Sequence, residues 1–317
     1  MPKRRQILLL LAAGLLVFVL WALLARNREP SFQGRSLTQW LTICQMRWPD
    51  GVKPNQIEQA EQAVRHIGTN ALPHYLKCIA YEPAPWQKSL SRLIDRLPDP
   101  LRGNHLAASL TYSGTSLEHA SLASLGFELL GPQAVPAIPE LTSLLHSTNS
   151  LGVRRQAAFA LASIGKEGLP PLLEALANTN YPRRSTVAMA ICSMHELGTN
   201  ASPAVPVLIR CTRDTDSALA AMSIQALGRL HIDPEAVVPA LTNAFRSADP
   251  EVRFRAVRSF VLWFGAEAYR AAPALRTMLA DPDYRIGMDA SNILAEVARE
   301  GHTNALAPEA LTNAPGR

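Results

Sequence analysis

The sequence lacks the motifs that mark common enzymes and metal sites. His195-Glu196 is not followed by the second histidine of a zinc-protease helix, and no histidine pair has ligand spacing near a cysteine or carboxylate. The stretch Ser113-Gly114-Thr115-Ser116 differs from the Gly-x-Ser-x-Gly turn of hydrolases. The glycines are scattered and form no phosphate-binding loop. We therefore expect no catalytic residue, no metal and no cofactor.

Cysteine is scarce, and the cysteines present form no recognisable pattern. The four residues Cys44, Cys78, Cys192 and Cys211 contain no Cys-x-x-Cys pair and are too widely spaced for a disulfide framework. We expect each to fill core space as a small apolar residue. A bridge between Cys192 and Cys211 stays open if the domain is exported, because the two fall on consecutive predicted helices.

The chain also has little excess charge. Its formal net charge is +5, and Lys3, Arg4 and Arg5 supply three of these charges, so that 5 − 3 = 2 remain for all later residues. A protein that binds nucleic acid through its phosphates needs a much stronger basic surface. We expect no nucleic-acid partner.

A long hydrophobic run is present near the N-terminus. Residues 7–25 contain no charge and no proline, and 19 helical residues span about 28 Å, close to the hydrocarbon thickness of about 30 Å. The pattern predicts a transmembrane signal anchor after a cationic flank at residues 1–6. A cleaved signal peptide is the alternative, although Leu23 stands where a small residue would precede cleavage after Ala25. The excess of cations before the span favours a cytoplasmic N-terminus, and residues 26–35 form a polar tether.

Glycine and proline recur with a regular period in the rest of the chain. Glycines end apolar helical runs at intervals of 30 to 37 residues, at Gly131, Gly165, Gly198, Gly228, Gly265 and Gly301. A proline opens the next run at Pro136, Pro170, Pro206, Pro239, Pro273 and Pro308. Glycine closes a helix in the left-handed conformation, and proline fits the first turn of the next helix. Each period therefore predicts two helices joined by a tight turn.

The helical periods carry apolar stripes that one pair of helices cannot bury alone. In the helix before Gly165, the residues Val153, Ala157, Leu161 and Ile164 recur at helical spacing. Stacking of successive pairs buries such stripes in one continuous core. We therefore predict an all-α fold, an α-solenoid of about six to seven helical pairs after one N-terminal transmembrane helix.

The repeated turn motif resembles that of a known family. Val153-Arg154-x-x-Ala157 and Asp249-Pro250-Glu251-Val252-Arg253-x-x-Ala256 resemble HEAT repeats, especially the short repeats of phycobilisome-lyase proteins. The resemblance is good over residues 116–312 and plausible over 56–80. We accordingly divide the chain into an N-terminal cap helix with degenerate repeats at 36–115 and HEAT-like repeats at 116–317. The cap helix begins after Ser36, a typical N-cap residue.

The resemblance also implies a structural role for some charged residues. In HEAT repeats, an arginine early in the second helix pairs with a turn aspartate of a neighbouring unit, which fixes the stacking. Residues matching this ladder are Arg154, Arg183, Arg253 and Arg285, with Asp216, Asp249 and Asp281 as acidic partners.

Other residues of the second helices are candidates for binding a partner. By the resemblance, second helices line the concave surface, so Arg155, Arg184, Arg255 and Arg258 are placed to contact another protein. Trp263 is a candidate anchor residue, with core packing as the alternative.

We thus expect a membrane-anchored HEAT-repeat scaffold that mediates protein–protein interaction. The expected location is the bacterial inner membrane, with the repeats on the extracytoplasmic side. The alternative implied by the resemblance is a bilin-lyase-like or other cofactor-handling enzyme.

Overall fold

The computed structural model describes residues 29–46, 53–81, 89, 92–93, 112–146 and 150–300. The predicted anchor at 7–25 lies outside these residues. In the described part of the chain, no helix has both the length and the apolar character needed to cross a membrane. The only strands described are β1 (Ser31–Phe32) and β2 (Arg35–Ser36), which pair antiparallel in a short hairpin.

A group of helices at the N-terminal end precedes the regular pairs. It contains α2 (Leu37–Gln45), α3 (Pro54–Ile67), η1 (Gly68–Ala71), α4 (Leu72–Ile79) and α8 (Tyr112–Leu130). Ser36 caps α2 as expected, because its side chain accepts a hydrogen bond from the Gln39 amide while the Gln39 side chain accepts one from the Ser36 amide. The apolar face of α2 is buried, with Trp40 and Leu41 each 2% exposed.

Five helical pairs follow, which confirms an α-solenoid. Their first helices are α9 (Ile138–His146), α11 (Leu169–Ala177), α13 (Ala204–Cys211), α15 (Pro234–Ala244) and α17 (Ala272–Thr277). Their second helices are α10 (Leu151–Ile164), α12 (Arg184–Cys192), α14 (Ser217–Leu230), α16 (Pro250–Ser259) and α18 (Tyr284–Arg299). A π-helical turn, η5 (Phe260–Phe264), extends α16.

Glycines with positive φ make most of the joints between successive pairs. Gly68, Gly131, Gly165, Gly198 and Gly265 have φ values between 48° and 99°, a region that other residues rarely adopt. Short 3₁₀ turns continue from these glycines to the next first helix: η2 (Gly131–Ala137), η3 (Lys166–Gly168), η4 (His195–Ala201) and η6 (Gly265–Ala271).

Gly228 was expected to end a helix, and this prediction is wrong. It lies inside α14, and the left-handed residue that follows this helix is His231, with φ 49°. A methyl group on Gly228 would stand 2.6 Å from Cε3 of Trp263 and 2.8 Å from Oγ of Ser259. Glycine is needed here because two helices approach closely, and not because a helix stops.

The core repeats with the helices. The third residue after the N-cap is buried in four second helices, at Val153, Leu219, Val252 and Ile286. Second helices pack directly on one another, most closely α12 on α14 and α14 on α16. The buried side chains of all pairs join in one hydrophobic cluster, as stacking of incomplete units requires.

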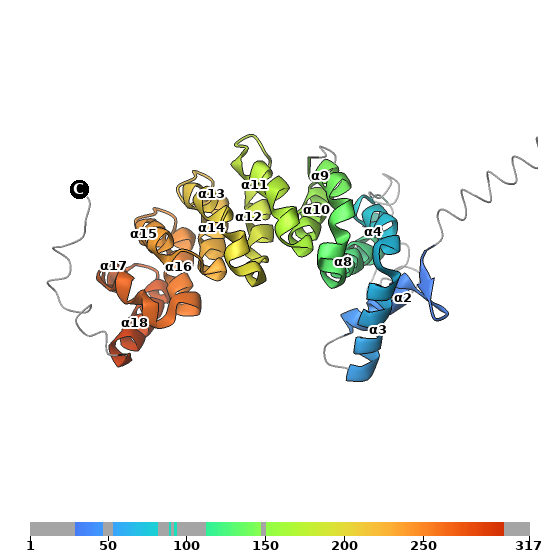
Figure 1. The fold of residues 1–317 in the computed structure, drawn as a ribbon. Coiled ribbons are helices and arrows are strands. Elements are labelled where there is room, and N and C mark those ends of the chain that lie inside the picture. Colours follow the sequence, from blue (N-terminus) through green and yellow to red (C-terminus); the bar gives the residue numbers. More distant parts are fainter. Residues whose placement is uncertain are drawn as a thin grey trace, which may run out of the picture.

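The pairs stack into a curved array (Figure 1). Second helices, among them α12, α14, α16 and α18, lie along the inner side of the curve, and first helices such as α11, α13, α15 and α17 lie along the outer side. We call the surface of the second helices the inner face.

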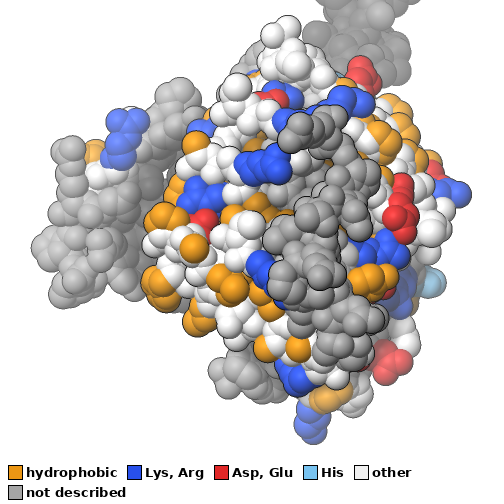
Figure 2. Space-filling view, turned by 90° about the vertical axis from the view of Figure 1, so that its left-hand side faces the viewer, with side chains coloured by type: hydrophobic (Ala, Val, Ile, Leu, Met, Phe, Trp, Pro, Cys, Tyr) orange, Lys and Arg blue, Asp and Glu red, His pale blue; other side chains and the backbone are white. Residues whose placement is uncertain are grey.

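The C-terminal end of the array exposes apolar side chains. Figure 2 views this end and shows hydrophobic and basic side chains intermixed at the surface, with few acidic ones. Tyr284 and Met288 on α18 are 77% and 53% exposed.

The cysteines are free thiols. Cys192 ends α12, Cys211 ends α13, and no disulfide links them. Burial raises the pKa of both thiols, consistent with the expected role as small core residues.

Candidate partner-binding surface on the inner face

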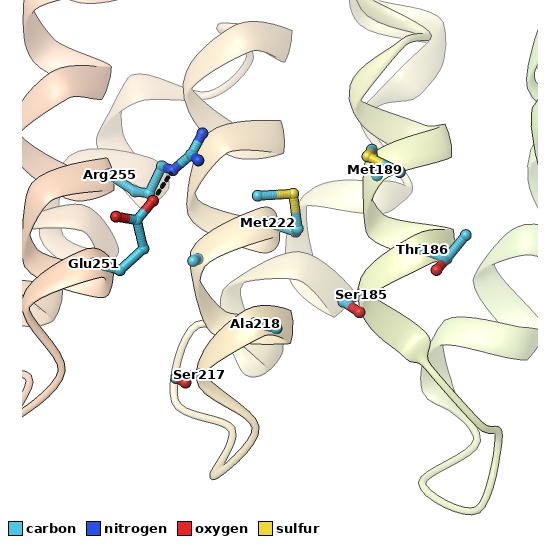
Figure 3. Close-up of a pocket in the computed structure, with 9 residues that line it drawn as sticks. Ser185, Thr186, Met189, Ser217, Ala218, Met222, Glu251 and Arg255 are labelled. Atoms are coloured by element: carbon cyan, nitrogen blue, oxygen red, sulfur yellow. Dashed lines mark hydrogen bonds and ion pairs between the residues drawn. The ribbon is translucent and has the colours of Figure 1, made fainter. Parts of the chain in front are cut away.

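An open hollow lies on the inner face where three second helices run side by side (Figure 3). Its volume is about 450 Å³, within the range of roughly 300–1,000 Å³ typical of ligand sites. It is lined by residues from the first two thirds of α12, α14 and α16: Ser185, Thr186, Met189, Ser217, Ala218, Ala221, Met222, Glu251 and Arg255.

One helix position recurs along the inner face. Counted from the N-cap residues Ser150, Arg183, Asp216, Asp249 and Asp283, the sixth residue comes one third to two thirds of the way along each second helix. The side chains at this position are Gln156, Met189, Met222, Arg255 and Asp289. They are 33 or 34 residues apart, the period of the repeat.

Polar bonds join this position to the preceding helix of the inner face at Gln156 and at Arg255. The Ser124 hydroxyl on α8 donates to Oε1 of Gln156 at 3.1 Å. Nη1 of Arg255 donates to Oε1 of Gln225 at 2.6 Å. These bonds cross the helix interfaces and therefore tie neighbouring units together.

The last bond of the row is an ion pair. Nη1 of Arg258 lies 3.2 Å from Oδ2 of Asp289, and Asp289 is only 4% exposed. Burying an unpaired carboxylate is costly, so that Arg258 stabilises Asp289 at the interface of α16 and α18.

The row changes character in the middle. Gln225 and Arg258, which bond to Arg255 and Asp289, are the ninth residues of α14 and α16. Met189 and Met222 occupy the recurring position in α12 and α14. The ninth residues of the helices before them, α10 and α12, are Phe159 and Cys192. None of these side chains has an amide or a charge, so the pattern of polar bonds cannot continue there. Met189 is 39% exposed. The interruption coincides with the hollow.

Two arginines that we expected to bind a partner thus have neighbours within the protein. Besides its bond to Gln225, Arg255 donates from Nε to Oε1 of Glu251 at 2.7 Å. Arg258 pairs with Asp289. Arg255 lines the hollow with its guanidinium held in place, whereas Arg258 does not belong to the lining. Their role toward a partner stays a prediction.

At α12 the ion pair to the next unit is made by Arg184 and not by Arg183. Nη2 of Arg184, expected to contact a partner, lies 2.6 Å from Oδ2 of Asp214 in the next unit. Arg183, assigned to the ladder, is exposed and has φ 55° before the helix begins. Arg184 is the first residue of α12, whereas Arg253 is the fourth residue of α16, and Val187 occupies that fourth position in α12.

At α16 the expected ladder residues meet. Arg253 binds Asp281 of the next unit through two bonds, Nε to Oδ2 at 2.7 Å and Nη2 to Oδ1 at 3.0 Å. Nη1 of Arg253 also donates to the Ser247 carbonyl. The bond from Arg253 holds the pKa of Asp281 below its ordinary value.

The remaining ladder candidates lie at turns. Asp216 and Asp249 are N-cap residues of α14 and α16, accepting from backbone amides in the first turn. Arg285 pairs with Asp283 in its own turn, and its guanidinium also lies 4.5 Å from the ring centre of Phe254 on α16. Arg154 lies four residues after the N-cap, as Arg253 does.

Arg155 and Trp263 differ in exposure. Arg155 is exposed and lines a small crevice beside Tyr181 and Thr186. Trp263 is half-buried and packs against the hydrophobic core beside Gly228. The structure does not gather Arg155, Arg255 and Trp263 in one site.

The two helix layers differ in charge. The second helices α10, α12, α14 and α16 contain seven arginines and one carboxylate, Glu251. The first helices α9, α11, α13 and α15 contain three glutamates and one arginine. The near-neutral chain is therefore polarised, with basic residues concentrated in the inner layer.

A second hollow of about 610 Å³ lies farther along the inner face, against α8, α10 and η4. Its lining is more polar and includes Glu128, Gln156, His195, Glu196 and Arg229. No group of three or more metal-ligating side chains occurs in the residues that the structure describes.

Sequence reasoning missed the two methionines. Met189 and Met222 are 33 residues apart, which matches the repeat period and was the available signal. The arginines at neighbouring positions are the more conspicuous feature of the sequence, and they drew attention away from the apolar residues at the equivalent place.

Comparison with known proteins identifies the repeats. The family model for HEAT repeats matches residues 115–192 and 193–260. The segment that forms the hollow is thus similar to HEAT repeats, in agreement with the resemblance seen in the sequence. The comparisons do not support the likeness to phycobilisome lyases. No protein with a curated description matches the sequence.

Several solved structures are similar to this chain. An engineered protein shares 18% identity, with 83% of this chain and 96% of that chain covered and a TM-score of 0.34. A designed armadillo repeat protein shares 16% identity, with coverage of 83% and 100% and a TM-score of 0.32. The Escherichia coli protein YibA shares 17% identity, with coverage of 70% and 96% and a TM-score of 0.34.

Proposed function

We propose that this chain is a membrane-anchored HEAT-repeat scaffold whose inner face binds a partner protein. The observation that carries the proposal is the open hollow on α12, α14 and α16, where exposed Met189 lies in an arginine-rich layer. A curved layer of parallel helices offers a long contact surface. A few apolar anchors at its centre supply most of the affinity in such interfaces.

The proposed mechanism is stoichiometric binding without chemical turnover. HEAT and armadillo-like repeat folds are typically non-enzymatic scaffolds. The side chains around the hollow are methionines, alanines, hydroxyl groups and one Arg255–Glu251 ion pair. This set can bury apolar groups and exchange hydrogen bonds with a partner.

Membrane anchoring is proposed from the sequence of residues 7–25 alone. Residues 7–25 are long and apolar enough to span a bilayer, and the preceding cations favour a cytoplasmic N-terminus. The repeats would then lie outside the cytoplasm of a bacterial cell, tethered to the inner membrane. This arrangement limits the partners to proteins that reach the same side.

Affinity purification of the full chain tests the proposal. Wild type, Met222→Glu and Met288→Glu are purified in detergent, and the co-purifying proteins are quantified by mass spectrometry. A charge placed in the hollow should remove a partner that wild type retains, because binding would bury the introduced carboxylate against the partner's apolar anchor without a compensating partner. Met288 lies at the exposed C-terminal end and outside the hollow, so its variant should keep the partner. Equal recovery from all three proteins would contradict the proposal.

A further inference from the structure

We propose that the hollow between α12 and α16 is the anchor site for an acidic segment of the partner, which inserts an apolar side chain between Met189 and Met222. The inference rests on the proposed function and adds the chemistry of the partner. It starts from the row of equivalent positions, where the two methionines stand between Gln156 and the Arg255–Glu251 pair.

The floor of the hollow is apolar. Met189 and Met222 come from adjacent helices, with Ala218 and Ala221 beside them, and small alanines leave the space that the hollow occupies. An unbranched thioether adapts its shape and contacts aliphatic and aromatic groups well. The floor therefore suits a large apolar side chain, such as leucine or phenylalanine.

The rim of the hollow is polar. Ser185 and Thr186 of α12 carry hydroxyl groups at one side of the hollow, and Arg255 with its partner Glu251 stands on α16 at the other (Figure 3). The Arg255 side chain is 34% exposed, and its bonds to Glu251 and Gln225 use Nε and Nη1. A guanidinium has five donor hydrogens, so the Arg255 side chain retains donors for a carboxylate from outside.

The layer of second helices around the hollow is rich in arginine. Seven arginines against one glutamate in α10, α12, α14 and α16 give this layer a positive excess. Aspartates from turns and from α18 pair with Arg184, Arg253 and Arg258. Arg155 and Arg229 are exposed on the same helices. Charge complementarity thus favours an acidic segment.

The apolar floor distinguishes this occupant from a nucleic acid. A polyanion would be bound mainly through phosphate contacts by many cations, and much of the positive excess here is neutralised within the protein. Methionines next to Arg255 instead match neighbouring apolar and acidic side chains of a polypeptide.

Fluorescence anisotropy with defined probes tests the inference on the full chain in detergent micelles. The first probe is a fluorescein-labelled peptide, Gly-Ser-Asp-Glu-Leu-Asp-Phe-Glu-Glu-Ser-Gly. In the second, lysine replaces every acidic residue, and in the third, serine replaces leucine and phenylalanine. A fourth probe is a 12-nucleotide single strand of DNA. The first peptide should bind at least about tenfold more tightly than any other probe.

Variants then locate the binding site. Met222→Glu and Arg255→Glu should each weaken binding of the first peptide about tenfold or more. Their matched controls are Met288→Glu, outside the hollow, and Arg210→Glu, on the first helix α13. The controls should leave the affinity within about twofold of wild type, and circular dichroism should show the same helix content for all proteins.

The outcomes separate this inference from the proposed function. Preference for the lysine peptide or for DNA, or equal loss in the control variants, would overturn the inference. If the first peptide does not bind while a protein co-purified with wild type is lost from Met222→Glu, the scaffold function stands and the acidic chemistry of the partner is wrong. If the first peptide does not bind and no co-purified protein is lost from Met222→Glu, the scaffold function is contradicted as well.

Discussion

The indole ring of Trp263 lies against the backbone of Gly228, so that a methyl group on Gly228 would come within 2.6 Å of Cε3. The contact joins α14 to the π-helical turn after α16. A tryptophan side chain has little freedom to move away from such a clash.

We predict that Gly228→Ala lowers the free energy of unfolding by about 1–3 kcal/mol, because overpacking forces the two helices apart. Gly152→Ala is the control, since its nearest neighbour, Oγ of Ser150, would lie 3.5 Å from the new methyl group. The control should keep or slightly raise the stability. Urea denaturation followed by circular dichroism measures both, and equal stabilities would argue against the close packing of Trp263.

A second close approach involves Tyr75 and Gly126 at the N-terminal end of the repeats. A methyl group on Gly126 would stand 2.2 Å from Cζ of Tyr75, whose ring is fully buried. Gly126→Ala should therefore destabilise the protein by about 2 kcal/mol or more. The Tyr75 hydroxyl has no hydrogen-bond partner in the part of the chain that the structure describes.

Removing that hydroxyl should be harmless. Leaving a buried hydroxyl unpaired costs roughly 1–3 kcal/mol, so Tyr75→Phe should keep or raise the free energy of unfolding. The midpoint of urea denaturation compares the variant with wild type. A clear loss of stability would mean that the hydroxyl has a partner.

The Arg253–Asp281 pair should contribute more to stability than the Arg285–Asp283 pair. Arg253 joins two units, and the side chain of Asp281 is only 3% exposed, whereas the Arg285 side chain is 44% exposed and bonds within its own turn. Arg253→Ala should cost about 2 kcal/mol, and Arg285→Ala, which removes an exposed pair and a cation–π contact with Phe254, should cost about 1 kcal/mol or less. Similar costs for the two variants would contradict the ladder role of Arg253.

The contribution of this pair should depend on pH. Arg253 lowers the pKa of folded Asp281 below its ordinary value of 3.8. The stabilisation is therefore complete above the unfolded pKa and is lost as pH falls through the folded one. The stability difference between wild type and Arg253→Ala should be constant from pH 7 to about 5 and narrow below about pH 4. If the stability difference between wild type and Arg253→Ala grew as the pH fell, this prediction would be contradicted.

The membrane topology is open to a direct test. Alkaline phosphatase fused after Arg317 is active only outside the cytoplasm, and green fluorescent protein at the same place serves as the cytoplasmic reporter. We expect phosphatase activity and no fluorescence, because the cations before residue 7 favour a cytoplasmic N-terminus. Exchange of Lys3, Arg4 and Arg5 for glutamate should weaken this preference. The reverse reporter pattern in the wild-type fusion would contradict the predicted location.

Sequence periodicity predicted the fold because the same physical need recurs in every unit. Positive-φ glycines such as Gly165 and Gly198 end helices, and buried residues such as Val153 and Val252 recur at the same helix position. Gly228 broke the rule because glycine also serves where helices approach closely. A glycine in a sequence does not reveal which of these two needs it meets.

The inner face was harder to predict than the fold. At α12 the ion pair to the next unit comes from Arg184 at the start of the helix and not from Arg183, which is the exposed N-cap residue. Arg255 and Arg258 found partners on adjacent helices, and such contacts depend on the rotation of each helix in the stack. Met189 and Met222 became a candidate site only once three helices were seen side by side.

Site-specific photocross-linking in living cells tests the scaffold account most directly. A benzoylphenylalanine residue replaces Met222 in the hollow or, as a control, Glu174 on the outer helix α11 of the full chain. The account predicts a cross-link from position 222 to one discrete protein and none to that protein from position 174. Cross-links to that protein from position 174 alone would contradict binding at the inner face.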